Sequence, residues 1–484
     1  MNYVFGKQRE QVLVESIEDY VHDDSEVRVM DKLVDSFNLD SLGFLIGKND
    51  ETGRPKYNPR DMLKLYIYGY YNGIRSSRKL QKQAIINREV IWLLKGLQPK
   101  QRAISDFRKE NTTALKQVFE VFVDFCNDIG LYGKTLVAID GTKIEASASK
   151  RRHISKRKLT IMKEKVQAKI NEYMKDLETN DRLIDNTENK QLNKVEIEKT
   201  IANLKKRLDK YSNQYKDLET KGINEINRTD PDARTVKFGA NQGTDLGYNI
   251  QTAVDDKYNL IAAFDVINSS ADQGQLFNMA AKAKDKLGVE KIEVLADKGY
   301  YNLEDIIKCE NNGITTYVSN SKNSNSIGDS RYFVDKFKYI KDLDIYICPE
   351  GNSLKCMTIK SGATIKRYRN FEACTNCKNK DKCTTAKNGK IVLRGPNEPM
   401  AELLRQRLKD EMPKYKKRQN IVEHPFGTIK RTMNFYYLLT RKFKMVRGEV
   451  SVAIFTYNLK RVISIIGVKG LMALIMGKMK LEAA

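Results

Sequence analysis

The sequence contains no long uninterrupted run of apolar residues. No stretch approaches the ~18 apolar residues that a membrane-spanning helix needs. The most apolar segment, 463–477, is broken by Gly467, Lys469 and Gly470, and the first residues, 1–7, lack the apolar core of a secretory signal. These absences argue against a membrane or secreted protein. They predict a cytoplasmic protein, in which seven cysteines are expected to be reduced.

Acidic residues are also fewer than basic ones. The 484 residues include 62 Asp and Glu against 86 Lys and Arg, which gives a formal net charge of +24. Residues 401–484 hold 18 basic and 6 acidic residues, so that +12, half of the total, lies in about a sixth of the chain. An excess clustered in this way favours a polyanionic partner, nucleic acid above all. The length allows two or three domains.

Two apolar, β-branched runs carry an aspartate. Residues 136–143 read Leu-Val-Ala-Ile-Asp-Gly-Thr-Lys and include Asp140, and residues 292–300 repeat the pattern with Asp297. Short apolar runs bounded by glycine are typical of buried strands, and a carboxylate at the end of such a strand is held still. There is a plainer interpretation of each. Asp140-Gly141 also fits a hairpin turn, and Asp297 also fits a strand-to-helix loop.

A third acid, Glu423, lies in a basic, helical stretch at 415–430. Alone it would be a surface charge. Grouped with Asp140 and Asp297 it would make a site of three like charges, which requires metal ions between them. Carboxylate oxygens suit Mg2+ or Mn2+, and a pair of such ions can hold the oxygens of an in-line phosphoryl displacement.

Residues 1–130 are expected to be helical. Asn58 and Pro59 make a good cap and first turn for a helix that ends at Gly73. Two short helices at 78–84 and 101–109 resemble a helix-turn-helix, and a plain helical bundle fits the same pattern. A longer amphipathic helix, 115–126, leads to the Asp140 run.

Residues 155–221 are strongly charged, with apolar residues at spacings of three and four on either side of a polar stretch, 180–189. The pattern predicts an antiparallel helical hairpin with a coiled-coil seam. A structural arm is the plain interpretation, and dimerisation or DNA contact is the alternative.

After residue 247 the period changes from helix to strand. We expect strands at 248–254 and 260–267, a helix capped by 269–272 and running to 286, the Asp297 strand, a helix from Leu303 and a strand at 315–318. This order predicts an α/β fold with a mixed sheet covered by helices.

Residues 320–400 interrupt the α/β pattern with a polar segment that holds five cysteines. Cys374 and Cys377 have the spacing of half a zinc knuckle, and Cys348 and Cys383 would complete four thiolates. Five residues separate Cys377 from Cys383, where two to four are usual. Free buried thiols are the alternative.

Together these features resemble the DDE transposases of bacterial insertion sequences. Residues 136–146 resemble the strand of the first aspartate in that family, and 294–300 resemble that of the second. Residues 415–430 resemble its Tyr-Arg-Glu-Lys signature, here Tyr415, Arg418, Glu423 and Lys430, with four residues instead of three between the arginine and the glutamate. Residues 58–80, 230–234, 247–255 and the Cys-rich segment resemble one branch of the family, so the resemblance spans nearly the whole chain.

The resemblance implies a domain plan. An all-α N-terminal domain for DNA binding or dimerisation would span 1–130, and an RNase H-like catalytic domain would span 131–465. The catalytic domain would carry a helical-hairpin insert at 155–225 and a Cys-rich insert at 320–400. A helical tail would follow at 466–484.

The resemblance also implies an activity. Asp140, Asp297 and Glu423 would hold two Mg2+ ions, and the enzyme would cleave insertion-sequence ends and transfer the 3′-OH strands into target DNA. Residues in contact with DNA would be Tyr415, Arg418, Lys430, Lys143 and Lys298. The partners would be terminal inverted repeats, target DNA and a second copy of the chain in a synaptic complex on the nucleoid. The rival interpretations are a non-catalytic sequence-specific DNA-binding protein and a metal-dependent DNA nuclease that does not join strands.

Overall fold

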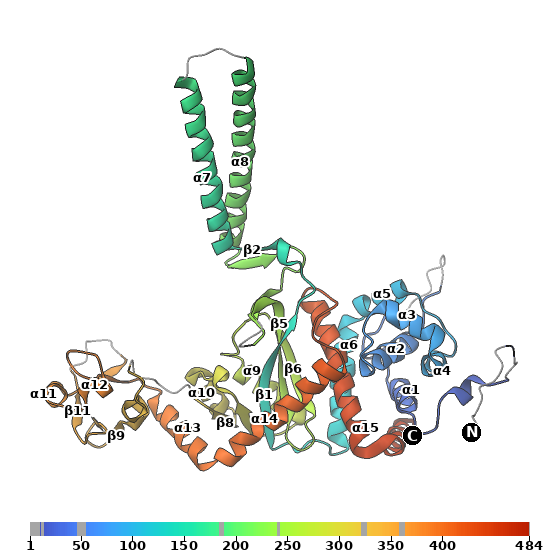
Figure 1. Ribbon diagram of the computed structural model, residues 1–484. Helices are drawn as coiled ribbons and strands as arrows, with labels where there is room; N and C mark the ends of the chain where they lie inside the picture. Colours follow the sequence, from blue (N-terminus) through green and yellow to red (C-terminus); the bar gives the residue numbers. More distant parts are fainter. Residues whose placement is uncertain are drawn as a thin grey trace, which may run out of the picture.

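The computed structural model describes residues 10, 14–45, 55–182, 188–239, 243–320, 327–357 and 364–483, without the side chains of 179–182, 188–194 and 479–483. A mixed sheet occupies the middle of the molecule, with a helical region at one end and a small second sheet at the other (Figure 1). A two-helix arm projects from the body beside the main sheet (Figure 1).

The main sheet has six strands in the order β4-β5-β1-β7-β8, with β6 also paired to β5. β1 runs antiparallel to β5 and parallel to β7, which runs parallel to β8, so the sheet is mixed, as predicted. The strands are β1 (Leu136–Glu145), β4 (Arg234–Lys237), β5 (Thr244–Asp255), β6 (Ile261–Ile267), β7 (Ile292–Ala296) and β8 (Ile314–Val318).

β1 does not end at Asp140. It pairs with β5 from Val137 to Glu145, but with β7 only from Leu136 to Ile139. The sequence interpretations of Asp140-Gly141 as a strand end or a hairpin turn are therefore wrong. The strand that ends beside Asp140 is its neighbour, β7, whose last residue is Ala296.

Helices surround this sheet. The N-terminal region contains η1 (Ile17–Tyr20), α1 (Glu26–Ser36), α2 (Pro59–Tyr71), α3 (Ser77–Ile86), α4 (Arg88–Leu93), α5 (Gln101–Glu110) and α6 (Thr112–Asp128). Later helices are α9 (Leu276–Leu287), η3 (Lys298–Tyr300), α10 (Leu303–Asn311), α13 (Glu398–Asp410), α14 (Met412–Gly427), the π-helical turn η6 (Thr428–Thr432) and α15 (Phe443–Ala483).

Several predicted boundaries are confirmed and two are corrected. Asn58 caps α2, where its side chain accepts a hydrogen bond from the Arg60 N–H at 2.9 Å. α4, between the two predicted short helices, was not foreseen. α9 begins only at Leu276, after Gln275, so residues 269–272 form a loop and do not cap it.

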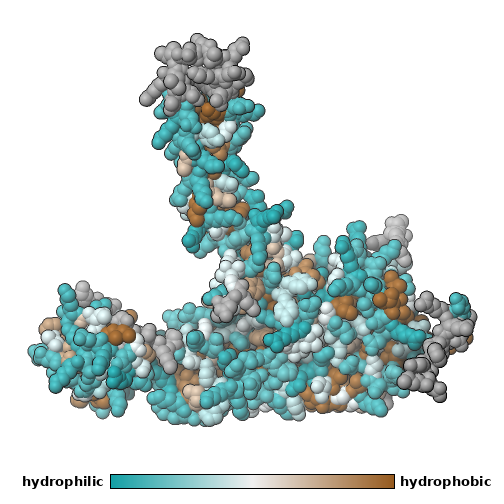
Figure 2. Space-filling view, in the orientation of Figure 1, coloured by the Kyte–Doolittle hydropathy of each residue, from teal (hydrophilic) through white to brown (hydrophobic). Residues whose placement is uncertain are grey.

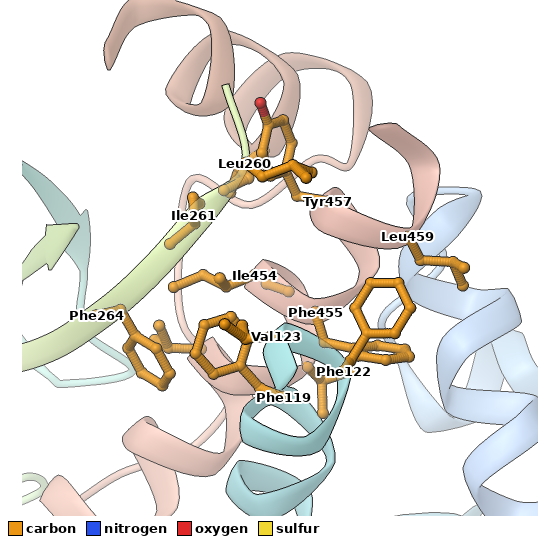
Figure 3. Close-up of a cluster of buried hydrophobic side chains, with 14 of the residues drawn as sticks. Phe119, Phe122, Val123, Leu260, Ile261, Phe264, Ile454, Phe455, Tyr457 and Leu459 are labelled. Atoms are coloured by element: carbon orange, nitrogen blue, oxygen red, sulfur yellow. The ribbon is translucent and has the colours of Figure 1, made fainter. Parts of the chain in front are cut away.

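One hydrophobic core joins the N-terminal helices to the sheet and to α15. Figure 3 shows part of it: Phe119 and Phe122 of α6 lie against Phe264 of β6 and Phe455 of α15. The same cluster of buried residues extends from Val21 to Ile475. α15 is not one straight helix, because Gly467 takes a left-handed φ of 72° inside it. No helix in the described ranges is long and apolar enough to cross a membrane.

A buried ion pair strengthens this junction. Arg75, after α2, lies 3.3 Å from Glu449 of α15, and both side chains are at most 3% exposed. Glu449 also accepts hydrogen bonds from the N–H groups of Leu439 and Thr440. The segment just before these residues pairs with the end of β1, since the Leu438 N–H donates to the Glu145 carbonyl at 2.8 Å.

The arm consists of α7 (Lys156–Arg182) and α8 (Glu188–Thr220), as the heptad pattern predicts. Its apolar seam is a separate small cluster built on Ile170, Ile201 and Leu204, and its surface is mostly hydrophilic (Figure 2). A short ladder, β2 (His153–Ser155) with β3 (Glu225–Asn227), follows η2 (Lys150–Arg152) and closes its base. Residues 183–187, within the predicted polar stretch, lie outside the described residues.

The cysteine-bearing region folds into a five-stranded sheet, which the sequence did not predict. Its strands are β9 (Lys338–Ile340), β10 (Ile345–Ile347), β11 (Ser353–Cys356), β12 (Lys366–Arg369) and β13 (Val392–Arg394), with η4 (Ser330–Tyr332), η5 (Val334–Lys336), α11 (Phe371–Thr375) and α12 (Lys380–Cys383). It has its own core, centred on the fully buried Tyr368. Arg394 of β13 holds Glu402 of α13 through two bonds of 2.6 and 3.1 Å, which ties this sheet to the main body.

Candidate active site

Asp140 and Asp297 are brought side by side by the parallel pairing of β1 and β7. Ile139 is in register with Ala296, and each aspartate is the next residue along the chain, Asp140 within β1 and Asp297 just after the end of β7. Asp297 caps η3, where its carboxylate accepts a hydrogen bond from the Gly299 N–H at 2.8 Å. The two carboxylates therefore stand where the pairing of the two strands stops.

The surroundings of Asp140 oppose its ionisation. Burial raises the pKa of Asp140 to about 6, and the charges of Asp297 and Asp272 add to the effect. The Gly141 N–H, which donates to Asp140 Oδ1 at 2.8 Å, and Arg418 act in the opposite direction. A cation placed among these carboxylates would reduce the repulsion between their charges.

α14 and η6 bring basic residues to Asp140. Arg418 Nη1 lies 3.8 Å from Asp140 Oδ2. Lys430 is half-buried in the π-helical turn; burial lowers the pKa of Lys430, the Lys143 charge lowers it further, and the Asp140 charge raises it. The predicted Arg418 and Lys430 thus both lie near the first aspartate, and π-helical turns are common at functional sites.

Glu423 is less closely engaged. It is exposed on α14, which packs against β1 and β7, and its Oε1 accepts a hydrogen bond from Gln419 Nε2 at 2.8 Å. Within the described ranges, no three His, Cys, Asp or Glu side chains are gathered closely enough to hold a metal ion.

The other predicted DNA-contacting residues differ in exposure. Tyr415 is half-buried and packs against the main core. Lys298 is exposed beside Asp297. Lys143 is not a free surface lysine, because its Nζ lies 3.0 Å from both carboxylate oxygens of Asp272.

Several residues at this site were missed at the sequence level. They are Asp272, Asn249, Gln251 and Tyr300, and the last three are fully buried. Asn249 and Gln251 are the polar members of the alternating pattern in β5, where a polar residue is usually taken as solvent-facing. The pattern around Asp272 predicts a helix cap, which the structure does not show. The only available signal was two amides in a strand whose other residues are apolar or small.

Four cysteines meet at the far end of the second sheet. Cys348, Cys374, Cys377 and Cys383 line one cavity of about 30 Å³, together with Lys380 and Lys390. Burial raises the pKa of Cys383 to about 11, the other three thiols add to this, and Lys390 opposes it.

The remaining cysteines are placed elsewhere. Cys356 donates to its neighbour, the Met357 carbonyl, at 3.4 Å and does not line this cavity. Cys126 and Cys309 are buried in the main core.

Two family models match the chain, and both describe transposase domains. A model of a transposase domain (DUF772) matches residues 15–110, and a model of a transposase DDE domain matches residues 347–463, a range that includes the four cysteines and Glu423. No curated protein sequence matches the chain. A cryo-EM structure of the piggyBac transposase synaptic complex with hairpin DNA aligns with 94% of this chain and 80% of that chain, at 9% identity and a TM-score of 0.32.

Proposed function

Because the chain belongs to the DDE transposases of the insertion-sequence type, we propose that it cleaves the ends of an insertion sequence and joins them to target DNA. The freed 3′-OH strands would be transferred by two-metal phosphoryl transfer. One observation carries this proposal: Asp140 and Asp297 follow paired positions of β1 and β7, with Arg418 facing Asp140. DNA binding without catalysis requires no such pair of carboxylates.

The donor set suits Mg2+, with Mn2+ as the alternative. Asp140, Asp297 and Glu423 offer only carboxylate oxygens, which hard divalent cations prefer. Asp140 and Asp297 follow paired positions of β1 and β7 and would share a cation, and Glu423 would complete the set from α14. When bound, a metal pair supplies a nucleophilic oxygen at neutral pH and stabilises charge on the leaving oxygen.

DNA is the proposed partner of the basic groups around these carboxylates. Arg418 and Lys430 would hold the phosphates on either side of the scissile bond, and Lys298 and Tyr415 would contact the strand beside Asp297 and α14. Terminal inverted repeats and target DNA would be bound in a synaptic complex of two copies of the chain. The basic excess of residues 401–484, which include α14, supports this assignment.

We also propose that the main sheet is that of an RNase H-like catalytic domain. If the short edge strand β4 is set aside, Asp140 lies in the first strand of the main sheet, Asp297 directly follows the fourth, β7, and Glu423 lies on a late helix. This is the arrangement that the resemblance implies. The limits 1–130, 131–465 and 466–484, with the arm and the second sheet as inserts, remain a prediction about how the chain is divided.

The test uses a labelled inverted-repeat duplex, a target plasmid and Mg2+. Nicks at the repeat ends followed by joined products support a transposase. Nicks alone would indicate a nuclease, and binding alone would indicate a non-catalytic DNA-binding protein. In the same assay Asp140→Ala, Asp297→Ala and Glu423→Ala should each reduce cleavage to a few per cent or less and leave binding intact, because each removes a proposed metal ligand and no phosphate contact. A variant that keeps substantial cleavage would remove its residue from the proposed ligand set.

For the second sheet we propose one zinc ion held by Cys348, Cys374, Cys377 and Cys383. The shared cavity supports this, as does the hydrogen bond that the Asn352 N–H donates to Cys348 Sγ at 3.3 Å. Lys380 and Lys390 would offset part of the charge of four thiolates around one Zn2+. No three metal-binding side chains of the described residues are close enough to hold an ion, so the sulfurs would have to draw inward to ~2.3 Å from the metal.

Metal analysis tests this proposal directly. Under reducing conditions the purified protein should contain one zinc per chain, and Cys377→Ser should lose it. Cys356→Ser is the matched control, because Cys356 lies in the same sheet but outside the cavity. Wild-type protein without zinc, or equal loss in the two variants, would rule out this set of ligands.

A further inference from the structure

A group of polar side chains lies behind the two aspartates. Side chains alternate along a strand, so Gly141 and Lys143 belong to the face of β1 opposite to that of Asp140. The register sets Gly141 against Gln251 of β5. Asp272, in the loop between β6 and α9, approaches this face.

Asp272 is the centre of the group. Both of its oxygens lie 3.0 Å from Lys143 Nζ. Its Oδ1 also accepts from Gln251 Nε2 at 2.8 Å and from Asn249 Nδ2 at 2.7 Å. Gln251 Oε1 in turn accepts from the Tyr300 hydroxyl. A continuous series of side-chain hydrogen bonds therefore links β1 to the turn that Asp297 caps.

These side-chain hydrogen bonds are shielded from water. Gln251 and Tyr300 are 0% exposed, and the Lys143 and Asp272 side chains are 13% and 22% exposed. Burial, then the charges of Asp272, Asp140 and Asp297, hold the pKa of Tyr300 well above its usual value. The hydroxyl therefore stays protonated and can donate, and a buried partner that lost this bond would have no water to replace it.

Gly141 makes this approach possible. A Cβ at this position would lie 2.4 Å from Gln251 Nε2 and 2.7 Å from Asp272 Oδ1, closer than real atoms come. Without a side chain at Gly141, Asp272 and Gln251 reach the backbone of β1 directly behind Asp140.

β1 needs support at this point because β7 no longer flanks it beyond Ile139. We propose that Asp272, Gln251 and Tyr300 form a clamp that holds Asp140 and Asp297 at the separation needed to share a divalent cation. These are positioning residues, and the inference rests on the proposed function.

The test measures metal binding without DNA, by electron paramagnetic resonance during titration with Mn2+. Tyr300→Phe removes one hydroxyl, and Asp272→Asn keeps the shape of the side chain but loses the ion pair with Lys143. Each should weaken Mn2+ binding about 10–100-fold, the usual effect of losing a residue that supports a metal ligand. Tyr301→Phe, the same change at the next residue, should bind Mn2+ as the wild type does. DNA binding in EDTA should be unchanged in Tyr300→Phe, and its unfolding temperature should fall by only a few degrees, the cost of one lost buried hydrogen bond.

Three results would overturn the clamp. One is wild-type Mn2+ affinity in both Tyr300→Phe and Asp272→Asn, and another is an equal loss in Tyr301→Phe. The third is a loss of Mn2+ binding in Tyr300→Phe accompanied by a fall in the unfolding temperature well beyond the cost of one hydrogen bond, since that is a packing defect. Failure of the proposed function looks different, because then the wild type binds no Mn2+ or binds it equally well after Asp140→Ala.

Discussion

At the scale of single residues, Asp140 lowers the stability of the fold that holds it. Its pKa is raised from 3.8 to about 6, first by burial and then by Asp297 and Asp272. Because the pKa of this acid is higher in the folded state than in the unfolded state, the folded state binds the proton more tightly. The resulting stabilisation is complete below the unfolded-state pKa, near 4, and it is lost as the pH rises through the folded-state pKa of about 6. At neutral pH the ionised carboxylate therefore disfavours the metal-free fold.

Asp140→Asn should accordingly stabilise the metal-free protein. The gain at pH 8 should be about 1–2 kcal/mol, because a shift of about two pKa units is moderated by a side chain that is 26% exposed. At pH 4 the gain should nearly vanish, since folded Asp140 is then protonated. Urea unfolding in EDTA at both pH values measures the difference. A gain that is the same at pH 4 and pH 8 would mean that ionisation is not its cause.

The sequence allowed the aspartates to be found but not their surroundings. Asp140 and Asp297 interrupt apolar runs, and that contrast is visible without a structure. Asn249 and Gln251 look like ordinary outward-facing members of an alternating strand, because alternation assigns a residue to a face and does not say what covers that face. Asp272 approaches β1 only through the tertiary fold, so its local pattern suggested a helix cap.

At the scale of elements, how well a helix or strand can be predicted from the sequence depends on its length. The long helices of the arm and five of the six strands of the main sheet show enough of their pattern to be recognised, whereas β4, with four residues, does not. β9, β10 and β13 have only three residues each, so no alternation can appear, and the second sheet went unpredicted. β1 was placed correctly but ended too early, because pairing with β5 continues it through a glycine and polar residues.

The arm should be removable without loss of the body. Its seam is a separate cluster, and Lys163 of α7 lies across from Tyr215 of α8, with its Nζ 5.5 Å from the ring centre. Replacing residues 164–214 with a short Gly/Ser linker at this point keeps the base ladder of β2 and β3.

The shortened chain should unfold within a few degrees of the full-length protein, as measured by differential scanning calorimetry. A version cut at the same place but with a Gly/Ser linker of twice the length controls for strain in the connection. An aggregated product from both versions would show that the body depends on the arm.

At the scale of the whole molecule, the N-terminal helices cannot be treated as a detachable reader of DNA. α6 packs against β6 and α15, and Arg75 is buried against Glu449. The helix-turn-helix interpretation of residues 78–110 is therefore better tested by substitutions of exposed residues, such as Arg102, than by deletion.

A chain that begins at residue 131 should fail to fold cooperatively. It would expose the apolar faces of β6 and α15 and leave Glu449 as a buried charge without its arginine. Circular dichroism during heating, with gel filtration, measures the outcome. A monomer with a sharp thermal transition would contradict the idea of one shared core.

The position of α15 has a consequence for synthesis on the ribosome. α6 ends at Asp128 and α15 begins at Phe443, so 315 positions separate two elements that form one core. At roughly 5–20 residues per second, a nascent chain would wait about 15–60 s before the part of α6 that packs on α15 could be covered. Folding of the body should therefore be completed only near the end of translation, and a message truncated before the codons of α15 should yield a chain that chaperones hold and proteases degrade.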